Sequence, residues 1–358
     1  MHATVTESAD SRKRNILTSA QLPPATTPAL IVTAVVAAAG VLALFGSASV
    51  GAVIALGAAV FLVASYSLSA AVEGTRKAKD RLARNIVTGL FLLALVPLIS
   101  VVWGTISKGM ARFDALFFSS SMRNVVGEGG GAVHAIWGTL IITGLATLIS
   151  VPIGILTAIY LVEYAGKAKL GRAIRFFVDV MTGIPSIVAG LFAYTVFSLF
   201  FGAGTNNGIS GACALAILMI PTVVRSTEEM LRLVPNELRE ASYALGVPKF
   251  RTIGRVVLPT SIAGIVTGVV LGIARIIGET APLLVTAAIT SSMNLNPLAN
   301  PMATLPVFVY YEYTTPGADP TPYIDRAWAG ALTLIIIVMG LNLIGRLIAW
   351  KFAPKAGR

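Results

Sequence analysis

Two ionisable residues, Arg275 and Glu279, lie deep within an otherwise apolar stretch at residues 259–290. Charged side chains are costly in such surroundings, and they normally face the interior of a helix bundle or a water-filled pathway. Because they are four residues apart, the two should share one helix face and form a buried ion pair. A guanidinium offers several donors in a planar fork that matches two oxygens of an oxyanion, and it stays protonated when desolvated. The pair therefore indicates either a contact for an anion or a structural ion pair that fixes helix packing.

The same stretch carries glycines at intervals of four residues, and on a helix they fall on the face of Arg275 and Glu279. They are Gly264, Gly268 and Gly272. Small residues let a second helix approach closely. The pattern predicts a packing seam against another helix, in this chain or in a partner. Pro282 lacks a backbone donor and predicts a kink beyond the pair.

Other residue types give little support for catalysis or for metal binding. The single cysteine, Cys213, lies in an apolar stretch, and the two histidines, His2 and His134, are far apart without a carboxylate at ligand spacing. We therefore expect no metal site, no disulfide and no catalytic residue. No Gly-x4-Gly-Lys-Ser/Thr pattern occurs, so we expect this chain to bind no ATP or other cofactor. The glycine-rich stretch 127–131 also lacks the Gly-Lys-Ser/Thr ending of a phosphate loop and predicts a flexible connector.

The composition indicates the elements that must position these residues. Of the 358 residues, 56% are hydrophobic and only 12% are charged, whereas soluble domains have about 25% charged residues. This composition excludes a soluble globule, a disordered chain and a disulfide scaffold. Apolar stretches long enough to approach or exceed a bilayer crossing predict an all-α polytopic membrane bundle of about eight transmembrane helices. They fall at 29–47, 51–72, 85–107, 135–162, 177–201, 209–224, 259–290 and 327–350.

The basic residues are distributed unevenly between the two sides of this bundle. The formal net charge is +11, and 22 of the 27 lysines and arginines fall in alternate connecting segments. These segments are the N-terminus, 73–84, 163–176, 225–258 and the C-terminal end from Arg346. Because cytoplasmic loops carry the excess of bases, we expect both termini to be cytoplasmic.

The segment 225–258 is the most informative part outside the apolar stretches. It should form short amphipathic helices, one of which starts at Pro235 and ends in a glycine cap at Gly246. Glu240-Ala241-Ser242, then Gly246, then Val256-Val257-Leu258-Pro259 resemble the EAA loop of ABC importer permeases, whose pattern is Glu-Ala-Ala-x3-Gly-x9-Ile-x-Leu-Pro. Ser242 and Val256 depart conservatively and leave the spacing unchanged. The resemblance implies that this loop docks on a cytoplasmic ATPase subunit through Glu237, Glu240, Ala241, Ser242 and Gly246.

Three further stretches narrow the resemblance to the permease subunits of bacterial phosphate-specific ABC importers. They are the stretches 183–192, 220–230 and 274–283, which begin Gly183-Ile184-Pro185, Ile220-Pro221-Thr222 and Ala274-Arg275-Ile276. The resemblance covers roughly residues 85–350. It implies a type I importer permease in the bacterial cytoplasmic membrane that forms half of an anion path and is not an enzyme by itself. The partners it implies are the lipid bilayer, a homologous second permease, two ATPase subunits that use the ATP, and an external phosphate-binding protein; no nucleic acid is implied.

With this resemblance, the chain divides into a permease domain and additional N-terminal parts. We expect a cytoplasmic tail, a further transmembrane hairpin, a basic linker, a transmembrane helix with an external segment, the permease domain with its coupling loop 225–258, and a short cytoplasmic tail. These are 1–28, 29–72, 73–84, 85–134, 135–350 and 351–358.

Three residues are candidates for the substrate path. Arg275 would bind the phosphate, and Glu279 would select phosphate over sulfate, because phosphate carries a hydroxyl that can donate to a carboxylate. Arg225, at the cytoplasmic end of its helix, would be either a second anion contact or a basic anchor. Asp179 is assigned no chemistry. A permease for sulfate or molybdate, or an autonomous anion channel or carrier, remains an alternative.

Overall fold

The computed structural model describes residues 22–46, 49–166 and 168–352, and all regular elements in these ranges are helical. Seven helices are long and apolar enough to cross a membrane, or eight if one sharply bent pair counts as a single span. The expectation of an all-α polytopic bundle is therefore confirmed. The chain divides into two compact units, residues 1–102 and 103–358. Most of the tails expected at 1–28 and 351–358 falls outside the described residues.

The first unit consists of α1 (Thr26–Leu44), α2 (Val50–Glu73) and most of α3 (Thr75–Gly109). Asn85 of α3 donates to the Ser65 hydroxyl of α2 at 2.9 Å, and Arg81 forms an ion pair with Glu73 at 2.8 Å. The linker expected at 73–84 is mostly helical, because Lys, Arg, Ala and Leu are good helix formers. Gly74, with φ +90°, separates α2 from α3.

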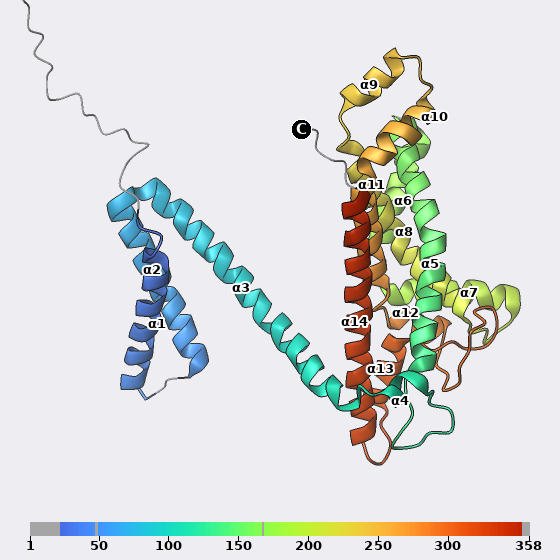
Figure 1. The fold of residues 1–358 in the computed structure, drawn as a ribbon, viewed down its shortest axis with the longest axis horizontal. Coiled ribbons are helices and arrows are strands. Elements are labelled where there is room, and N and C mark those ends of the chain that lie inside the picture. Colours follow the sequence, from blue (N-terminus) through green and yellow to red (C-terminus); the bar gives the residue numbers. More distant parts are fainter. Residues whose placement is uncertain (1–21, 47–48, 167, 353–358) are drawn as a thin grey trace, which may run out of the picture. The chain divides into compact units, whose positions relative to one another are not determined.

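The second unit is a helical bundle with short helices at its ends (Figure 1). After α3 come a 3₁₀ turn (Met110–Arg112), α4 (Ala115–Ser119), α5 (Val133–Ile159), a π-helical turn (Tyr160–Tyr164), α6 (Lys169–Thr182), α7 (Ser186–Phe201), α8 (Gly208–Arg232), α9 (Asn236–Ala244), α10 (Lys249–Thr252), a second π-helical turn (Ile253–Val257), α11 (Leu258–Ile276), α12 (Ala281–Thr286), α13 (Leu305–Thr314) and α14 (Thr321–Phe352).

Helix α8 lies at the centre of this bundle and packs mainly against α5 and α11. Two thirds of its most apolar window is buried, the largest share among the candidate spans of the described chain. The core around it is made of small and branched apolar side chains, including Ile142, Leu215, Met219, Val223 and Ile276. The element that carries Thr222 and Arg225 is therefore the most buried of these spans within the chain.

The expectation that residues 177–201 form one continuous helix is wrong. Helices α6 and α7 meet at 110° around Gly183-Ile184-Pro185. Pro185 has no backbone N–H and disfavours helical geometry at Ile184, so α6 ends and α7 starts in a new direction. Gly190 of α7 lies so close to Pro282 of α12 that an added Cβ would be 2.6 Å from the Pro282 Cα.

Two other boundaries differ from expectation. The stretch 259–290 is not one helix, because α11 ends at Ile276 and α12 begins at Ala281 with Pro282 in its first turn. A proline there cannot continue the preceding helix, since its ring clashes with the carbonyl four residues back. Helix α8 extends to Arg232, beyond the expected end at 224, so the segment between spans starts at Leu233.

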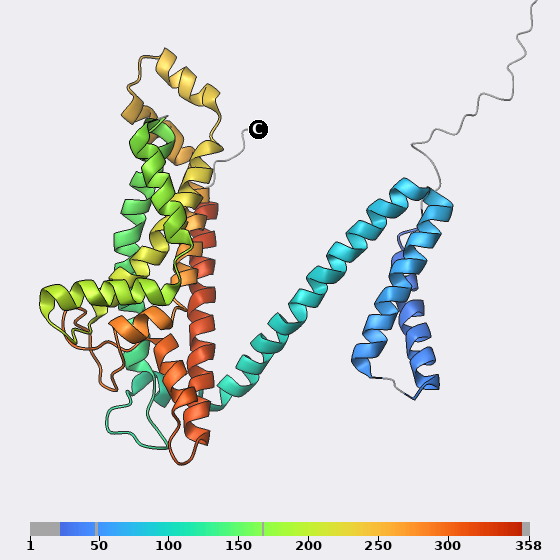
Figure 2. The same cartoon turned by 180° about the vertical axis from the view of Figure 1, so that it is seen from behind.

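The two ends of the second unit differ in character. Helices α9 and α10 lie at one end, together with the end of α14, whereas α4 and the start of α14 lie at the opposite end (Figures 1 and 2).

The glycine stretch 127–131, which was expected to be a flexible connector, is held in place by hydrogen bonds from two arginines. Arg326 donates to the carbonyls of Gly127 and Gly129 at 2.6 and 3.1 Å, and Arg112 donates to that of Gly130 at 2.8 Å.

Arg326 also forms a buried ion pair with Glu312 of α13. Its Nε lies 2.7 Å from the Glu312 carboxylate, and the arginine side chain is fully buried. Burial raises the pKa of Glu312, although the adjacent Arg326 guanidinium opposes that shift. This pair ties α13, α14 and the glycine stretch together.

Candidate functional site

Arg275 lies in the last turn of α11, on the exposed side of the helix within this chain. Its Nη1 donates to the Thr222 hydroxyl of α8 at 3.3 Å. In the described part of the chain, no carboxylate forms an ion pair with it. Most donors of the fork thus remain available to an anion or to a group from another subunit.

Glu279 does not share a helix face with Arg275, and the expected buried ion pair is absent among the described residues. Helix α11 ends three residues before Glu279, and the chain turns there as the Glu279 N–H donates to the Ile276 carbonyl at 3.1 Å. Glu279 is half-buried. The break imposed by Pro282 and Gly278 removes the four-residue helical spacing on which the pairing depends.

The three seam glycines face α8 of the same chain. A Cβ added at Gly264 or Gly268 would collide with Met230 or Ser226, and one at Gly272 would be 3.4 Å from the Met219 Cε. As residue numbers rise along α11, the contacted numbers fall along α8, so the two helices are antiparallel. The seam brings the end of α11 close to α8 and places Arg275 beside Thr222.

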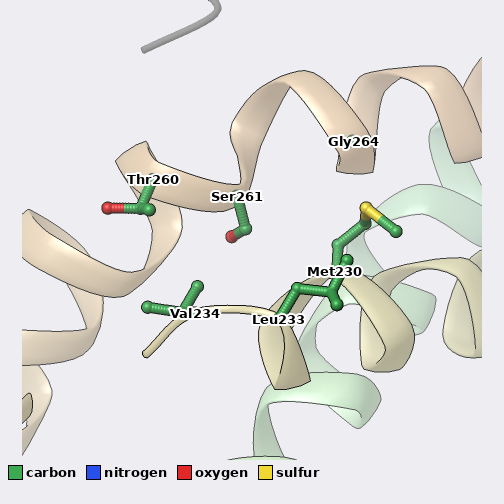
Figure 3. Close-up of a pocket in the computed structure, with 6 residues that line it drawn as sticks. All are labelled: Met230, Leu233, Val234, Thr260, Ser261 and Gly264. Atoms are coloured by element: carbon green, nitrogen blue, oxygen red, sulfur yellow. The ribbon is translucent and has the colours of Figure 1, made fainter. Parts of the chain in front are cut away.

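A pocket of about 140 Å³ lies where α8 ends and α11 begins (Figure 3). In this view the Met230 sulfur points toward Gly264, and the Thr260 and Ser261 hydroxyls lie on the α11 side. The remaining lining residues are Leu233 and Val234. Ser261 already donates to the Val257 carbonyl at 2.9 Å, and no charged side chain lines the space. This pocket does not have the chemistry of an anion site.

Arg225 is not at the end of its helix, because α8 continues for seven further residues. It forms ion pairs with Asp179 of α6 and with Glu228, whose carboxylate is 3.5 Å from Nη1. Glu228 is buried and also pairs with Arg175 at 3.3 Å and with Arg232. Arg225 thus has two carboxylate partners on α6 and α8, which favours a structural role that joins these helices.

The sequence-based reasoning missed this network. The sequence assigned no chemistry to Asp179 and placed Glu228 in the segment 225–258, for which it predicted short amphipathic helices. The spacing of Arg225, Glu228 and Arg232 at three and four residues carried a usable signal, because such positions are neighbours on one helix face. The partners on α6 gave no comparable local signal.

The segment that resembles an EAA loop forms α9 and α10, beyond the end of α8. Glu237, Glu240, Ala241 and Gly246 are exposed, and Gly246 has φ +73°, as a glycine after a helix end commonly does. Ser242 is half-buried and its hydroxyl is 2.9 Å from that of Thr252. Helix α9 therefore presents two carboxylates on its exposed surface.

Within residues 22–46, 49–166 and 168–352, no three histidine, cysteine or acidic side chains are grouped so that they could hold a metal ion. What the arrangement offers is an exposed arginine beside the central helix at one place and an exposed acidic helix at another.

Comparison with protein families matches residues 150–358 to the binding-protein-dependent transport system inner membrane component. The chain is 45% identical over 276 residues to phosphate transport system permease protein PstA 1 of Mycobacterium tuberculosis (strain CDC 1551 / Oshkosh), which covers 76% of this chain and 89% of that protein. It is also 40% identical over 283 residues to PstA of Yersinia pestis, covering 79% and 93%.

Among solved structures, a bacterial alginate ABC transporter matches with a TM-score of 0.56 and 15% identity, covering 78% of this chain and 97% of the other. The MetNI methionine ABC transporter in an inward-facing conformation matches with a TM-score of 0.50 and 21% identity, covering 62% and 96%. At these identities the likeness concerns the fold, which is the helical fold of ABC importer permeases.

Proposed function

Since the chain belongs to the binding-protein-dependent transport system inner membrane component family, we propose that it is a permease subunit of an ATP-driven phosphate importer. It is a multi-pass protein of the bacterial inner membrane and is not catalytic alone. The importer to which it contributes also contains ATPase subunits and a binding protein. The observation that carries the choice of substrate is the 45% identity over 276 residues to a phosphate transport system permease.

Arg275 is the residue we propose as the phosphate contact. It is exposed within this chain although it ends a helix of the apolar bundle, and Thr222 is the partner found for it there. A charge in that position is costly unless water, a ligand or another subunit solvates it. A guanidinium with free donors can donate to two oxygens of a phosphate. Because one arginine alone makes this contact, the phosphate can also be released. Glu279, half-buried a few residues further on, would accept from a phosphate hydroxyl.

Helix α9 is the element we propose for coupling to the ATPase. Its exposed Glu237 and Glu240, and the exposed apolar side chains of Leu238 and Leu245, offer a mixed surface suited to a protein groove. We propose that ATP is bound by two copies of that ATPase, that a homologous second permease completes the path, and that an external phosphate-binding protein delivers the substrate. Both termini and α9 would then lie on the cytoplasmic side.

In the mechanism that follows, closure of the ATPase subunits on ATP moves α9 and rocks the bundle around a central anion path. Arg275 faces that path from the junction of α8 and α11. Arg225 is engaged with Asp179 and Glu228, so we propose for it the joining of helices rather than anion binding.

The test is uptake of labelled phosphate in cells that lack this gene and receive either the wild-type chain or Arg275→Ala at equal membrane abundance. Phosphate uptake by wild type that excess sulfate does not inhibit, and its loss in Arg275→Ala, is the expected result. Normal uptake by Arg275→Ala would remove the arginine from the path.

Two alternatives give different results in the same assays. A sulfate or molybdate permease would show competition by that anion. An autonomous channel or carrier would pass phosphate in vesicles that contain this chain without ATPase subunits, whereas the permease gives no flux there.

A further inference from the structure

Helix α9 is attached to the bundle almost without apolar burial. None of its nine residues is buried. Apolar packing is the usual means by which one helix holds another. A helix that must transmit movement to the bundle therefore needs a different attachment, and polar contacts are available for it.

Arg239 is a half-buried residue of α9, and its side chain is only 12% exposed. Its Nη2 and Nε donate to one oxygen of the Glu163 carboxylate at 2.9 and 3.1 Å. Glu163 is itself 5% exposed at its side chain. Charge-assisted bonds with two donors fix direction as well as distance, so this contact is stiff.

The same guanidinium also binds the end of the central helix. Nη2 donates to the Leu231 carbonyl at 2.8 Å, and Nη1 donates to the Val234 carbonyl at 2.6 Å. The last carbonyls of a helix lack intrahelical partners and carry the negative end of its dipole, so a cation there satisfies both. Arg239 thus holds α9 to α8, the helix that carries Thr222 beside Arg275.

Glu163 is presented by the π-helical turn Tyr160–Tyr164 that follows α5. In this turn the Ala165 N–H donates to the Tyr160 carbonyl, five residues back, at 2.7 Å. The extra residue changes the direction of the side chains that follow it, and such turns often occur at functional sites. Lys249 of α10 meets the same turn, since its ammonium donates to the Glu163 carbonyl and lies 4.9 Å from the centre of the Tyr164 ring. Residues of both α9 and α10 therefore contact this one turn.

We propose that Glu163 and Arg239 form a clamp that transmits the movement of α9 to α5 and α8, so that ATP use and substrate movement stay linked. The two are positioning residues, since neither is expected to touch phosphate or ATP. The inference rests on the proposed function of α9 as the ATPase-coupling element. It goes beyond that function by assigning the connection to two particular side chains.

The experiment uses the complete importer in proteoliposomes, with phosphate uptake and ATP hydrolysis measured on the same preparation. The variants are Glu163→Gln, Arg239→Gln and the double variant, with co-purification of the ATPase subunit measured for each. Arg255→Gln is the matched control, because Arg255 is an exposed arginine of the same segment and forms no ion pair with Glu163 in the described part of the chain.

Each single variant is expected to keep its ATPase subunit and to hydrolyse ATP, with phosphate transported per ATP reduced about tenfold. The double variant should be no worse than Arg239→Gln alone, because that change already removes the contact with Glu163. Arg255→Gln should retain the wild-type ratio.

Three outcomes overturn the clamp. They are an unchanged ratio in both single variants, loss of the ATPase subunit from the complex, or an equal fall in Arg255→Gln. If the wild-type importer takes up no phosphate, the proposed function fails instead. The clamp is then tested by the dependence of ATP hydrolysis on the binding protein. The wild-type importer should show this dependence, and Arg239→Gln should abolish it.

Discussion

Three arginines of the second unit differ in the partners that their charges have. Arg326 is fully buried and bound to Glu312 and to loop carbonyls, and Arg225 pairs with two carboxylates. Arg275 is exposed and donates to one neutral hydroxyl. A charge that already has its partner serves packing, whereas one without a carboxylate partner requires solvent or a ligand. This difference is the reason for placing Arg275, and not Arg225, on the path.

Glu279→Gln is expected to weaken the preference for phosphate over sulfate by about tenfold, the size of a hydrogen bond to a charged group. The amide can donate to sulfate, whereas the carboxylate repels it and accepts from the phosphate hydroxyl. The measurement is the sulfate concentration that halves labelled-phosphate uptake. Glu279→Asp, which keeps the charge, is the control. An unchanged halving concentration in Glu279→Gln would exclude the selectivity role.

Arg326→Leu is expected to destabilise the protein by about 3–5 kcal/mol, because Glu312 would be left buried without its cation. Adding Glu312→Gln to it should recover part of the loss. Thermal unfolding of the purified protein measures both. Arg123→Leu, at an exposed position, is the control, and equal unfolding temperatures for Arg326→Leu and Arg123→Leu would contradict the role of the buried pair.

At the scale of elements, prolines and glycines decide where helices end and how closely they approach. Pro185 and Pro282 break stretches that are apolar throughout, and Gly190 allows α7 to pack directly on Pro282. The glycines of α11 let that helix lie against α8. These positions thus bring α11 against α8 and α7 against α12.

Gly268→Val is expected to separate α11 from α8, since an added side chain meets Ser226. Overpacking of this kind costs about 1–3 kcal/mol. Abundance in the membrane and the thermal unfolding temperature should both fall. Gly144→Val is the comparison, because nothing lies within 4 Å of a Cβ at that helical glycine. Similar losses in both variants would mean that the helix propensity of valine, and not the seam, sets the effect.

In the whole molecule, the family match and the proposed functional residues fall in one of the two units. The family match lies at residues 150–358, entirely within the second unit, and the coupling segment and Arg275 lie there too. The first unit contributes α1, α2 and most of α3, and its internal contacts, such as Arg81 with Glu73, are made within itself. The residues proposed for substrate contact and for coupling thus all belong to the second unit.

A chain that begins at residue 74, without α1 and α2, is expected to insert and to keep phosphate uptake within about twofold of the full chain. Removal of two spans leaves the orientation of the following helices unchanged, because the basic residues at 76–84 still precede α3's apolar part. Uptake at matched membrane abundance measures this. Abolished uptake with normal abundance would assign the first unit an essential role in transport.

The all-helical membrane fold, the family and the segment that resembles an EAA loop can all be recognised from local features of the amino-acid sequence. Hydrophobicity over some twenty residues and the spacing Glu240-Ala241-Ser242 to Pro259 are local properties, and they can be recognised without knowing the contacts. The same reasoning located Arg275 and the glycine face of α11.

The contacts that these residues make depend on how distant parts of the chain pack. Local periodicity extended α11 to Glu279, but Pro282 ends the helix earlier and separates the expected pair. The glycine face could have met any helix, and the fold selects α8. Arg239 and Glu163 are 76 residues apart, and no local pattern relates positions at that distance. Such contacts exist only when the chain has packed, because side chains from distant helices then share one desolvated space.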